Sequence, residues 1–330
     1  MSKFDKEYLT LCKKILTDGV NVSNRTGINT TKLPSYFFSF DLEEEFPILT
    51  TKQVFIRQAV LEMLWIYQAG SNDVRWLQER NVHIWDKWMI DADGIYRIYD
   101  NHPHLEVSSD KEVIVKGIND ENLYDMMGNP ITTKGLDPKS EIVGAKYFGK
   151  DAAYTIGTAY GYIVKKMKLI DNLIDTLKNN PTDRRMIMSL WQNDYLKTAV
   201  LPSCVWSSEW DVTNGRLNAL VHQRSCDVPL GLPFNVTQYA VLLHMLARTT
   251  NLMPGTLSWS IKDAHIYDNQ ISMIKEQIRR YEELGDFEAP QLWLNPDIKN
   301  FYDFDNSKEC KDVKVKNYKH HGKIDIPLTQ

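Results

Sequence analysis

The dipeptide Asn214-Gly215 restricts the fold more than any other feature, because it separates two strand-like segments, 203–212 and 216–224. Asn-Gly suits a turn whose two central residues both have positive φ, so the two segments are predicted to form an antiparallel hairpin. Further strand-like segments cover 35–40, 184–192 and 256–267. The strands come in groups and do not alternate strictly with helices, which favours an α+β fold built on a large mixed β-sheet packed with helices.

Four segments have the apolar pattern of helices. Segment 55–70 is nearly all apolar and contains one acid, Glu62, so we expect a helix that is buried on most sides. Segment 163–181 has apolar residues at three- and four-residue spacing and ends at a proline, which indicates one amphipathic surface helix. The other two helices are predicted over 235–249 and 268–284.

Residues 91–150 differ from the rest of the chain. They are polar and weakly periodic, and turn-forming motifs such as DADG and MGNP interrupt them. A length of 330 residues suits one large domain or two smaller ones. We predict a single domain over 1–330, with an inserted small lobe of short strands and turns at about 91–150.

Composition excludes several classes of protein. The formal net charge of −4 gives no sign of non-specific nucleic-acid binding. No apolar run reaches about 18 residues, so we expect no membrane span. The opening residues MSKFDKEYLTLCKK lack the apolar stretch of a secretory signal, which predicts a cytoplasmic location. The four cysteines show no CxxC spacing, and the clusters NHPHL and KHHGK lack a third ligand nearby, so we expect neither a disulfide nor a metal.

Cys204 is the candidate nucleophile. It opens a strand-like segment after LPS, which places a small sulfur atom near a loop. The thiolate is the nucleophilic form, and a nearby cation lowers the pKa of a thiol. Arg224 is a candidate for that cation, because the hairpin pairs its segment with that of Cys204. The alternative is a buried cysteine that packs as a small hydrophobic side chain.

Four arginines stand in turns or at strand ends: Arg25, Arg184, Arg185 and Arg224. Guanidinium groups bind phosphate or carboxylate in bidentate fashion, so several of them together suit a dianionic group. The alternative is that each arginine pairs with an acid on the surface.

Other candidates fit a site or the core. Burial would raise the pKa of Glu62 and suit it to proton transfer near neutral pH, unless it forms a buried salt bridge. Asn235 is either a helix N-cap or an amide that reads the edge of a pyrimidine. Trp85 and Trp88 either pack in the core or form a wall for a flat ring.

Nine motifs together resemble the folate-dependent, cysteine-nucleophile thymidylate synthase family. They are RTG (Arg25), TTK (Lys52), LEMLW (Glu62), IWDKW (Trp85, Trp88), AYG (Tyr160), DRR (Arg184, Arg185), LPSC (Cys204), HQRSCDVPLGLPFN (Arg224 to Asn235) and DAHIY (His265, Tyr267). The resemblance covers almost the whole chain apart from the inserted lobe. Its most specific part is RSCD with GLPFN after a PxC.

The resemblance implies a methyltransferase that packs as a sheet-to-sheet homodimer. The enzyme would convert dUMP to dTMP with 5,10-methylenetetrahydrofolate as cosubstrate. The Cys204 thiolate would add to carbon 6 of uracil, and carbon 5 would take the methylene group. Loss of the carbon 5 proton would expel the folate, and hydride from the same folate would reduce the methylene, giving dTMP and dihydrofolate.

By position, the resemblance assigns three groups of residues. The catalytic residues would be Cys204, Glu62, Tyr160, Asn235 and Arg224. The nucleotide would be bound by Arg25, Arg184, Arg185, Arg224, Ser225, Cys226, Asp227, Asn235, His265 and Tyr267, with Arg184 and Arg185 reaching in from the other subunit. The folate would be bound by Lys52, Trp85, Trp88, Asp227, Leu230, Gly231, Phe234 and Thr329, and the terminal PLTQ would fold over the site.

Three features depart from the family pattern. Val205 follows the nucleophile where many relatives carry a histidine, the chain ends in Gln330 where an aliphatic residue is usual, and 91–150 have no counterpart in the shorter members. Two alternatives share the fold: a dUMP hydroxymethyltransferase, which would quench the methylene with water, and a regulator that binds RNA such as its own mRNA. Asn235 argues against a cytosine-specific enzyme.

Overall fold

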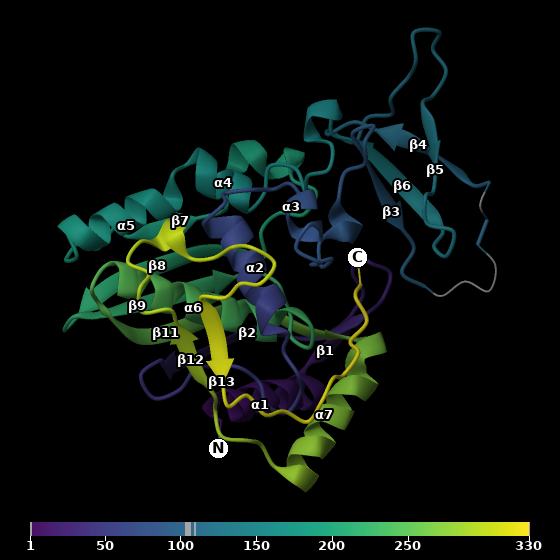
Figure 1. The fold of residues 1–330 in the computed structure, drawn as a ribbon. Helices are drawn as coiled ribbons and strands as arrows, with labels where there is room; N and C mark the ends of the chain where they lie inside the picture. Colours follow the sequence, from purple (N-terminus) through teal and green to yellow (C-terminus); the bar gives the residue numbers. More distant parts are fainter. Residues whose placement is uncertain (1, 103–106, 109, 330) are drawn as a thin grey trace.

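A seven-stranded mixed sheet forms the centre of the fold (Figure 1). The computed structural model describes residues 2–102, 107–108 and 110–329. The strand order is β1-β2-β11-β9-β8-β7, with β10 paired to β11. The bounds are β1 Val20–Val22, β2 Thr30–Asp41, β7 Ile187–Ser189, β8 Val205–Thr213, β9 Arg216–Gln223, β10 Cys226–Asp227 and β11 Met253–Tyr267. Strand β11 runs parallel to β9 and β10, and the other pairs are antiparallel, so the predicted α+β class with a mixed sheet is confirmed.

The predicted hairpin joins β8 and β9. Thr213 pairs with Arg216 in an antiparallel ladder, and Asn214 and Gly215 between them have φ values of 52° and 75°. Positive φ at both positions is what a two-residue turn of this kind requires. Because the hairpin fixes the register, the residues just after β9 lie beside the residues just before β8.

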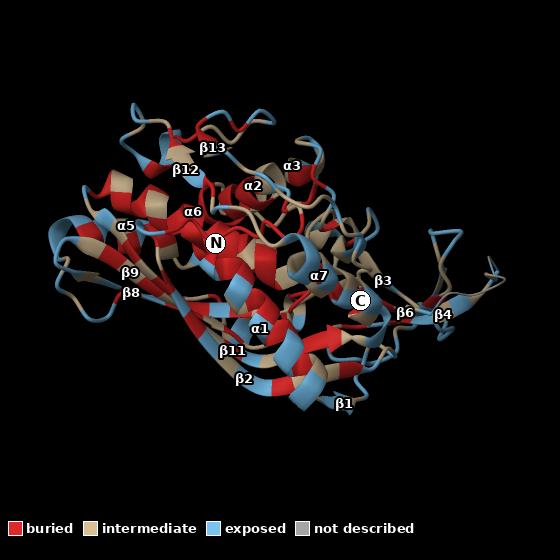
Figure 2. Cartoon of the chain, turned by 90° about the horizontal axis from the view of Figure 1, so that it is seen from below, coloured by how far each residue is buried: buried red, intermediate tan, exposed pale blue. Residues whose placement is uncertain are grey.

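Helices cover one side of the sheet. Helices α1 (Lys3–Asp18) and α6 (Gly231–Thr249) contact the strands, and α2 (Ile56–Tyr67) packs on α6. Every second residue of β9 is buried, which is the pattern of a sheet with one covered face. Figure 2 shows the buried residues gathered where α6 meets the sheet.

Helix α6 begins four residues before its predicted start, at Gly231. Pro233 fits its first turn, because the N–H groups there have no partner within the helix. Asn235 therefore lies inside α6, and the N-cap alternative for this residue is wrong. Leu230 occupies the cap position without a side-chain cap bond. Helix α2 is buried nearly throughout, as predicted.

The single surface helix predicted over 163–181 is wrong. Helices α4 (Gly161–Lys166) and α5 (Leu169–Asn179) are separated at Lys168, whose φ of 53° is left-handed. Helix α4 packs on α2, whereas α5 packs on β7. The change of direction lets each helix bury its apolar residues against a different neighbour, and apolar spacing alone does not reveal it.

The remaining elements of the main body are short. Helix α7 (Ile271–Leu284) follows a single 3-10 turn, and only Ile187–Ser189 of the strand predicted over 184–192 has β-structure. The others are α3 Arg75–Gln78, β12 Gln291–Leu294, β13 Val313–Lys316 and the 3-10 turns Asp86–Trp88, Lys150–Ala152, Asn193–Thr198, Asp268–Gln270 and Phe301–Asp303. Within the described ranges, no helix has the length and apolar character to cross a bilayer.

A second sheet lies within residues 91–150, a segment that we call the lobe. Its strands are β3 Ile95–Tyr99, β4 Glu112–Lys116, β5 Thr132–Lys134 and β6 Ile142–Tyr147, in the order β3-β6-β4-β5. None of these strands joins the main sheet, and the lobe projects to one side of the molecule (Figure 1).

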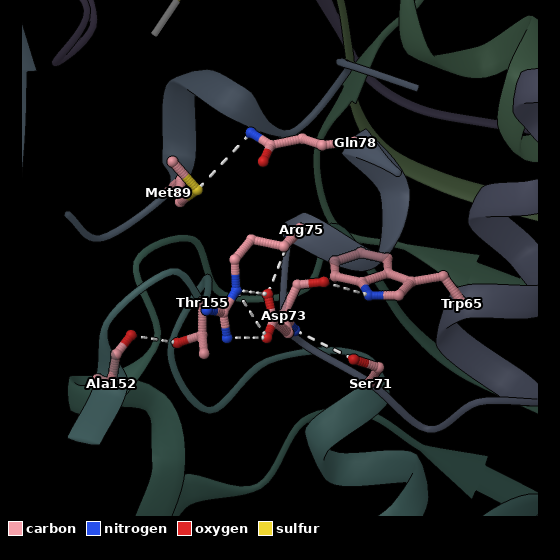
Figure 3. A network of polar contacts seen from close by, with 8 residues as sticks. All are labelled: Trp65, Ser71, Asp73, Arg75, Gln78, Met89, Ala152 and Thr155. Atoms are coloured by element: carbon pink, nitrogen blue, oxygen red, sulfur yellow. Dashed lines mark hydrogen bonds and ion pairs between the residues drawn. The ribbon is translucent and has the colours of Figure 1, made fainter. Parts of the chain in front are cut away.

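Polar contacts fix the base of the lobe, and part of this network is drawn in Figure 3. The Trp65 indole of α2 donates to the Asp73 carbonyl at 3.0 Å, and Arg75 Nε donates to the Asp73 carboxylate at 3.0 Å. Thr155 forms an isolated bridge with Asp73, and its carbonyl accepts from Ile90 N at 2.9 Å. The chain segments that enter and leave the lobe are therefore tied to each other and to α2.

Candidate active site

Cys204 lies directly before β8, and a fixed guanidinium group lies beside it. The Arg224 side chain donates to the Ser203 carbonyl at 3.0 Å and to the Pro202 carbonyl at 2.7 Å. These bonds hold Arg224 Nη2 3.9 Å from Cys204 Sγ, and Arg224 N donates to the Cys204 carbonyl at 2.9 Å. The hairpin register thus brings together the thiol and the cation that the sequence predicted as neighbours.

Burial raises the pKa of the Cys204 thiol above its usual range, although Arg224 and Arg25 act to lower it. The sequence led us to expect a lowered thiol pKa, and the structure contradicts this because desolvation outweighs the cations. The thiol is nevertheless no simple core residue, because it is only partly buried and lines two cavities.

The two cavities meet at Cys204. The first, of about 350 Å³, is mainly apolar and lies beside α2 and α6. It is lined by the predicted residues Glu62, Trp85, Trp88, Tyr160, Cys204, Ser225, Asp227, Leu230, Gly231, Phe234 and Asn235. The second, of about 360 Å³, is more polar and is lined by Arg25, Trp88, Cys204, Arg224, Ser225, Asp227, Leu230, Gly231, His265, Tyr267 and Thr329. The arrangement offers a flat apolar chamber on one side of the sulfur and a cationic one on the other.

Glu62 reaches the first cavity from α2. Its carboxylate accepts from the Trp85 indole at 2.7 Å and from the Gln238 amide. Burial raises the pKa of Glu62 to about 7, although both hydrogen bonds act to lower it. Both partners are neutral, so the alternative of a buried salt bridge is wrong. A carboxyl group with this pKa can exchange protons near neutral pH.

Tyr160 lies against the nucleophile, where its hydroxyl oxygen accepts from Cys204 N at 3.0 Å. Burial raises the pKa of Tyr160 well above its usual value, so the phenol keeps its proton. Its backbone has φ 47° and ψ −107°, a conformation that residues other than glycine rarely adopt. Strained backbone of this kind clusters at functional sites.

Asn235 is held in the first cavity by a residue that the sequence reasoning missed. Its side-chain oxygen accepts from Gln223 Nε2 at 3.2 Å, and Gln223 Oε1 accepts from the Trp259 indole at 2.9 Å. Gln238, the partner of Glu62, was also missed. The signal for Gln223 was available, because it is a polar residue at a buried position of β9.

The strand pair β10 and β11 places Asp227 beside His265. The Asp227 carboxylate accepts from Leu230 N and from Gln270 Nε2, both at 3.0 Å, and burial raises its pKa. His265 Nδ1 lies 3.0 Å from Asp263 Oδ1, and its ring meets that of Tyr267 edge to face at 5.2 Å. These contacts give the second cavity a fixed set of polar groups.

Four predicted site residues lie outside both cavities. Cys226 is fully buried in β10, so its side chain does not support the predicted contact with substrate. The Lys52 ammonium donates to the Pro229 carbonyl below the site, and burial lowers its pKa to about 8. Arg184 and Arg185 are exposed before β7, and Arg185 pairs with Asp183 at 2.9 Å.

The carboxyl-terminal segment lies beside both cavities. Leu328, one of the terminal PLTQ residues, borders both cavities. The Thr329 side chain is buried, and its hydroxyl has no hydrogen-bond partner. Gln330 lies outside the described residues. In the described part of the chain, no group of three or more His, Cys, Asp or Glu residues is placed to hold a metal.

Comparison with known proteins identifies the family and the fold. The family model for thymidylate synthase matches residues 6–330. The chain belongs to the thymidylate synthase family. It is 42% identical over 329 residues to thymidylate synthase of Clostridium beijerinckii, with 100% of both chains covered. It is 34% identical over 343 residues to thymidylate synthase 1 of Bacillus subtilis strain 168, with 98% of both covered. The solved structure of thermostable thymidylate synthase A from Bacillus subtilis has a TM-score of 0.73 at 33% identity and covers 99% of both chains.

Membership of the thymidylate synthase family confirms the predicted family, the fold, the enzyme class and methylenetetrahydrofolate as cosubstrate. Thymidylate synthases are dimers that bind dUMP and folate. The high coverage of both chains means that these relatives match this chain through the region of the lobe as well.

Proposed function

We propose that this chain catalyses the reductive methylation of dUMP to dTMP, with 5,10-methylenetetrahydrofolate as carbon and hydride donor and dihydrofolate as second product. The observation that carries the proposal is the position of Cys204, at the junction of an apolar and a cationic cavity and 3.9 Å from Arg224 Nη2. A nucleophile for carbon 6 of uracil needs a flat chamber for the base on one side and an anion site for the phosphate on the other.

The second cavity suits the phosphate and sugar of dUMP. Arg25, Arg224 and Ser225 line it and would bind the dianion through charge-assisted hydrogen bonds. His265 and Tyr267 line the same cavity and would bind the deoxyribose hydroxyl.

The first cavity suits two flat rings. Gln223 fixes the Asn235 amide, which would donate to the uracil carbonyl at position 4 and reject cytosine. Trp85, Trp88 and Phe234 would give the folate ring an apolar wall. Asp227 would accept from the ring edge, and Leu230 and Gly231 would lie against the ring.

Two groups beside the cavity would manage protons. Glu62, with a pKa of about 7, would exchange a proton with the uracil ring. Tyr160, which stays protonated, would hold a water molecule by a hydrogen bond, and that water would accept the proton that carbon 5 loses. Because burial favours the protonated thiol, Cys204 would have to lose its proton as it attacks carbon 6, and Arg224 would stabilise the thiolate.

The dimer would share its sites. The face of the main sheet opposite the helices carries exposed Phe37, Ile187 and Trp206, which suits sheet-to-sheet packing. Arg184 and Arg185 are exposed and line neither cavity of their own chain, so we infer that they bind the phosphate in the partner's site. We also infer one catalytic domain over 1–330 with the lobe as an insertion.

A dihydrofolate assay tests the proposed reaction. Dihydrofolate is expected in a one-to-one ratio with dTMP, because the folate supplies both the methylene group and the hydride. A hydroxymethyltransferase would consume dUMP without forming dihydrofolate, and that outcome would overturn the proposal. The wild-type dimer is assayed beside Val205→His, which restores the residue of many relatives and is expected to remain active.

A trapping experiment tests the nucleophile, the substrate class and the cosubstrate together. The protein is incubated with 5-fluoro-dUMP and methylenetetrahydrofolate and its mass is measured. Because fluorine cannot leave as the proton does, a stable ternary adduct is expected, and peptide mapping should place it on Cys204. An adduct on another residue would contradict the assigned nucleophile.

A further inference from the structure

The loop between β1 and β2, residues 23–29, carries Arg25 and is called the Arg25 loop. Asn24 shapes it, because its side-chain oxygen accepts from Thr26 N at 2.9 Å and its amide donates to the Ile28 carbonyl at 2.8 Å. Arg25 itself is exposed and lines the cationic cavity together with Arg224. Whereas backbone carbonyls of the core hold Arg224, the position of Arg25 depends on this loop.

The lobe contacts the Arg25 loop directly. Asn101 Nδ2 donates to the Thr26 carbonyl at 2.9 Å. The His102 ring lies against Gly27 so closely that a Cβ there would meet the ring at 3.0 Å, and Gly27 has a φ of 81°. His102 Nδ1 in turn lies 2.9 Å from Asp100 Oδ1. Residues 100–102 of the lobe therefore brace the tip of the Arg25 loop.

The lobe also forms one wall of the space beside Arg25. A cavity of about 420 Å³ is bounded by Arg25 and Arg224 on one side and by Tyr96, Lys146 and Phe148 of the lobe on the other. The lobe is fixed at its base by the hydrogen bonds described above, so a contact at residue 101 is made from an anchored element. A loop held by an anchored element loses less conformational entropy when it binds a ligand.

We propose that Asn101 is a positioning residue, and that the lobe acts through it to hold the Arg25 loop in the conformation that binds the phosphate of the nucleotide. This inference rests on the proposed function, which places Arg25 at the phosphate. Thr26, whose carbonyl Asn101 holds, directly follows Arg25 and lines the same cavity, so the brace acts next to the guanidinium group that it positions.

Asn101→Ala tests the proposal. Loss of this hydrogen bond should weaken dUMP binding about threefold to tenfold, as measured by calorimetry on the intact dimer. The inhibition constant of inorganic phosphate against dUMP should rise by the same factor, and the KM for methylenetetrahydrofolate should stay within about twofold. The matched control is Asn129→Ala in the same lobe, whose amide contacts Asp125 instead and which should leave all three values unchanged.

A double-mutant cycle with Arg25→Ala separates positioning from a general structural effect. In the Arg25→Ala background, Asn101→Ala should change dUMP affinity by less than about twofold, because the group that it positions is gone. An equal loss in both backgrounds, or an unchanged phosphate inhibition constant, would overturn the proposal. If Asn101→Ala does not fold, Asn101→Asp keeps the shape, removes the donor and should weaken phosphate binding further.

The binding measurements need no turnover, which keeps the two proposals distinguishable. A wild-type protein that binds dUMP but forms no dihydrofolate would contradict the proposed function. The double-mutant cycle would then still decide whether Asn101 positions the Arg25 loop. A fully active wild type with additive Asn101 and Arg25 effects would contradict the lobe proposal alone.

Discussion

The two halves of the site are held in different ways. Cys204, Arg224, Asp227 and His265 lie on or beside strands of the main sheet, where ladder bonds and backbone carbonyls fix them. The Arg25 loop, the lobe and the terminal segment lie outside the sheet and depend on individual side-chain contacts such as Asn101 to Thr26. The proposed nucleophile and the cation beside it thus lie on rigid structure, whereas Arg25 and the terminal segment lie on parts of the chain that fewer contacts hold.

The largest effect is expected in the rigid half. Cys204→Ala should lower turnover by at least about 10⁴-fold, because no other group can form the covalent adduct. Binding of dUMP should stay measurable, since the cavity and its cations remain. Steady-state assays and calorimetry check the two parts. Near-normal turnover would remove Cys204 from the mechanism, and Cys310→Ala, remote from the cavities, is the control.

Glu62→Gln should lower kcat by about 10²- to 10³-fold, because a general acid-base group is lost while the fold is retained. The pH dependence of stability gives an independent check. Burial raises the pKa of Glu62 from 4.5 to about 7, so the folded state holds a proton that the unfolded state has released over that range.

The stability of the wild type should therefore fall as pH rises from about 4.5 to about 7, by about 3 kcal/mol from this group alone. Glu62→Gln removes that dependence, and the difference in unfolding free energy between the two proteins should change by about 2.5 kcal/mol between pH 5 and pH 8. Denaturant titrations at both pH values measure it. If the unfolding free energies of the wild type and Glu62→Gln change with pH in parallel, Glu62 has an ordinary pKa.

The comparison between the two halves also separates what the sequence can predict from what it cannot. The pairing of Cys204 with Arg224 was predictable, because Asn214-Gly215 sets the hairpin register and both residues stand at its open end. A well-defined turn fixes the register of the two strands that it joins, and the register fixes which residues lie opposite each other along their whole length. Gln238 was missed because it lies within the largely apolar helix α6, and its partner Glu62 lies on a different helix.

Burial and non-local packing account for the remaining differences. The raised pKa of Cys204 depends on desolvation by distant segments, which the neighbouring residues do not reveal. The sequence predicts a helix that starts at Asn235, after Pro233. The helix starts earlier, because proline is also tolerated in the first turn of a helix. The contact of Asn101 with Thr26 joins two loops that belong to different sheets. No hydrophobic pattern in the sequence predicts such a contact.

Subunit exchange tests whether Arg184 serves the site of the partner subunit. A Cys204→Ala protein mixed with an Arg184→Ala protein should regain about one quarter of wild-type activity, because half of the randomly formed dimers carry one intact site. The activity is followed after partial denaturation and dilution, with each variant treated alone as the control. If no activity returns while mass measurement shows mixed dimers, Arg184 does not serve the partner's site.

The smallest effect is expected at the terminal segment. The Thr329 hydroxyl is buried without a partner, so the open enzyme bears the cost of its desolvation. Thr329→Val removes that cost and should raise the free energy of unfolding by about 1 kcal/mol. If the hydroxyl gains a partner when the segment closes over bound ligands, the same change should raise the KM for methylenetetrahydrofolate about threefold.

A Thr329→Val protein that is more stable but binds folate more weakly would show that the terminal segment changes its contacts when the ligands bind. Thr10→Val on the exposed face of α1, where the hydroxyl bonds a helix carbonyl, is the matched control and should change neither value by much. A Thr329→Val protein that is less stable and binds folate normally would show that the hydroxyl already has its partner in the free enzyme. The terminal segment would then belong with the strands, because its contacts would be complete before any ligand arrives.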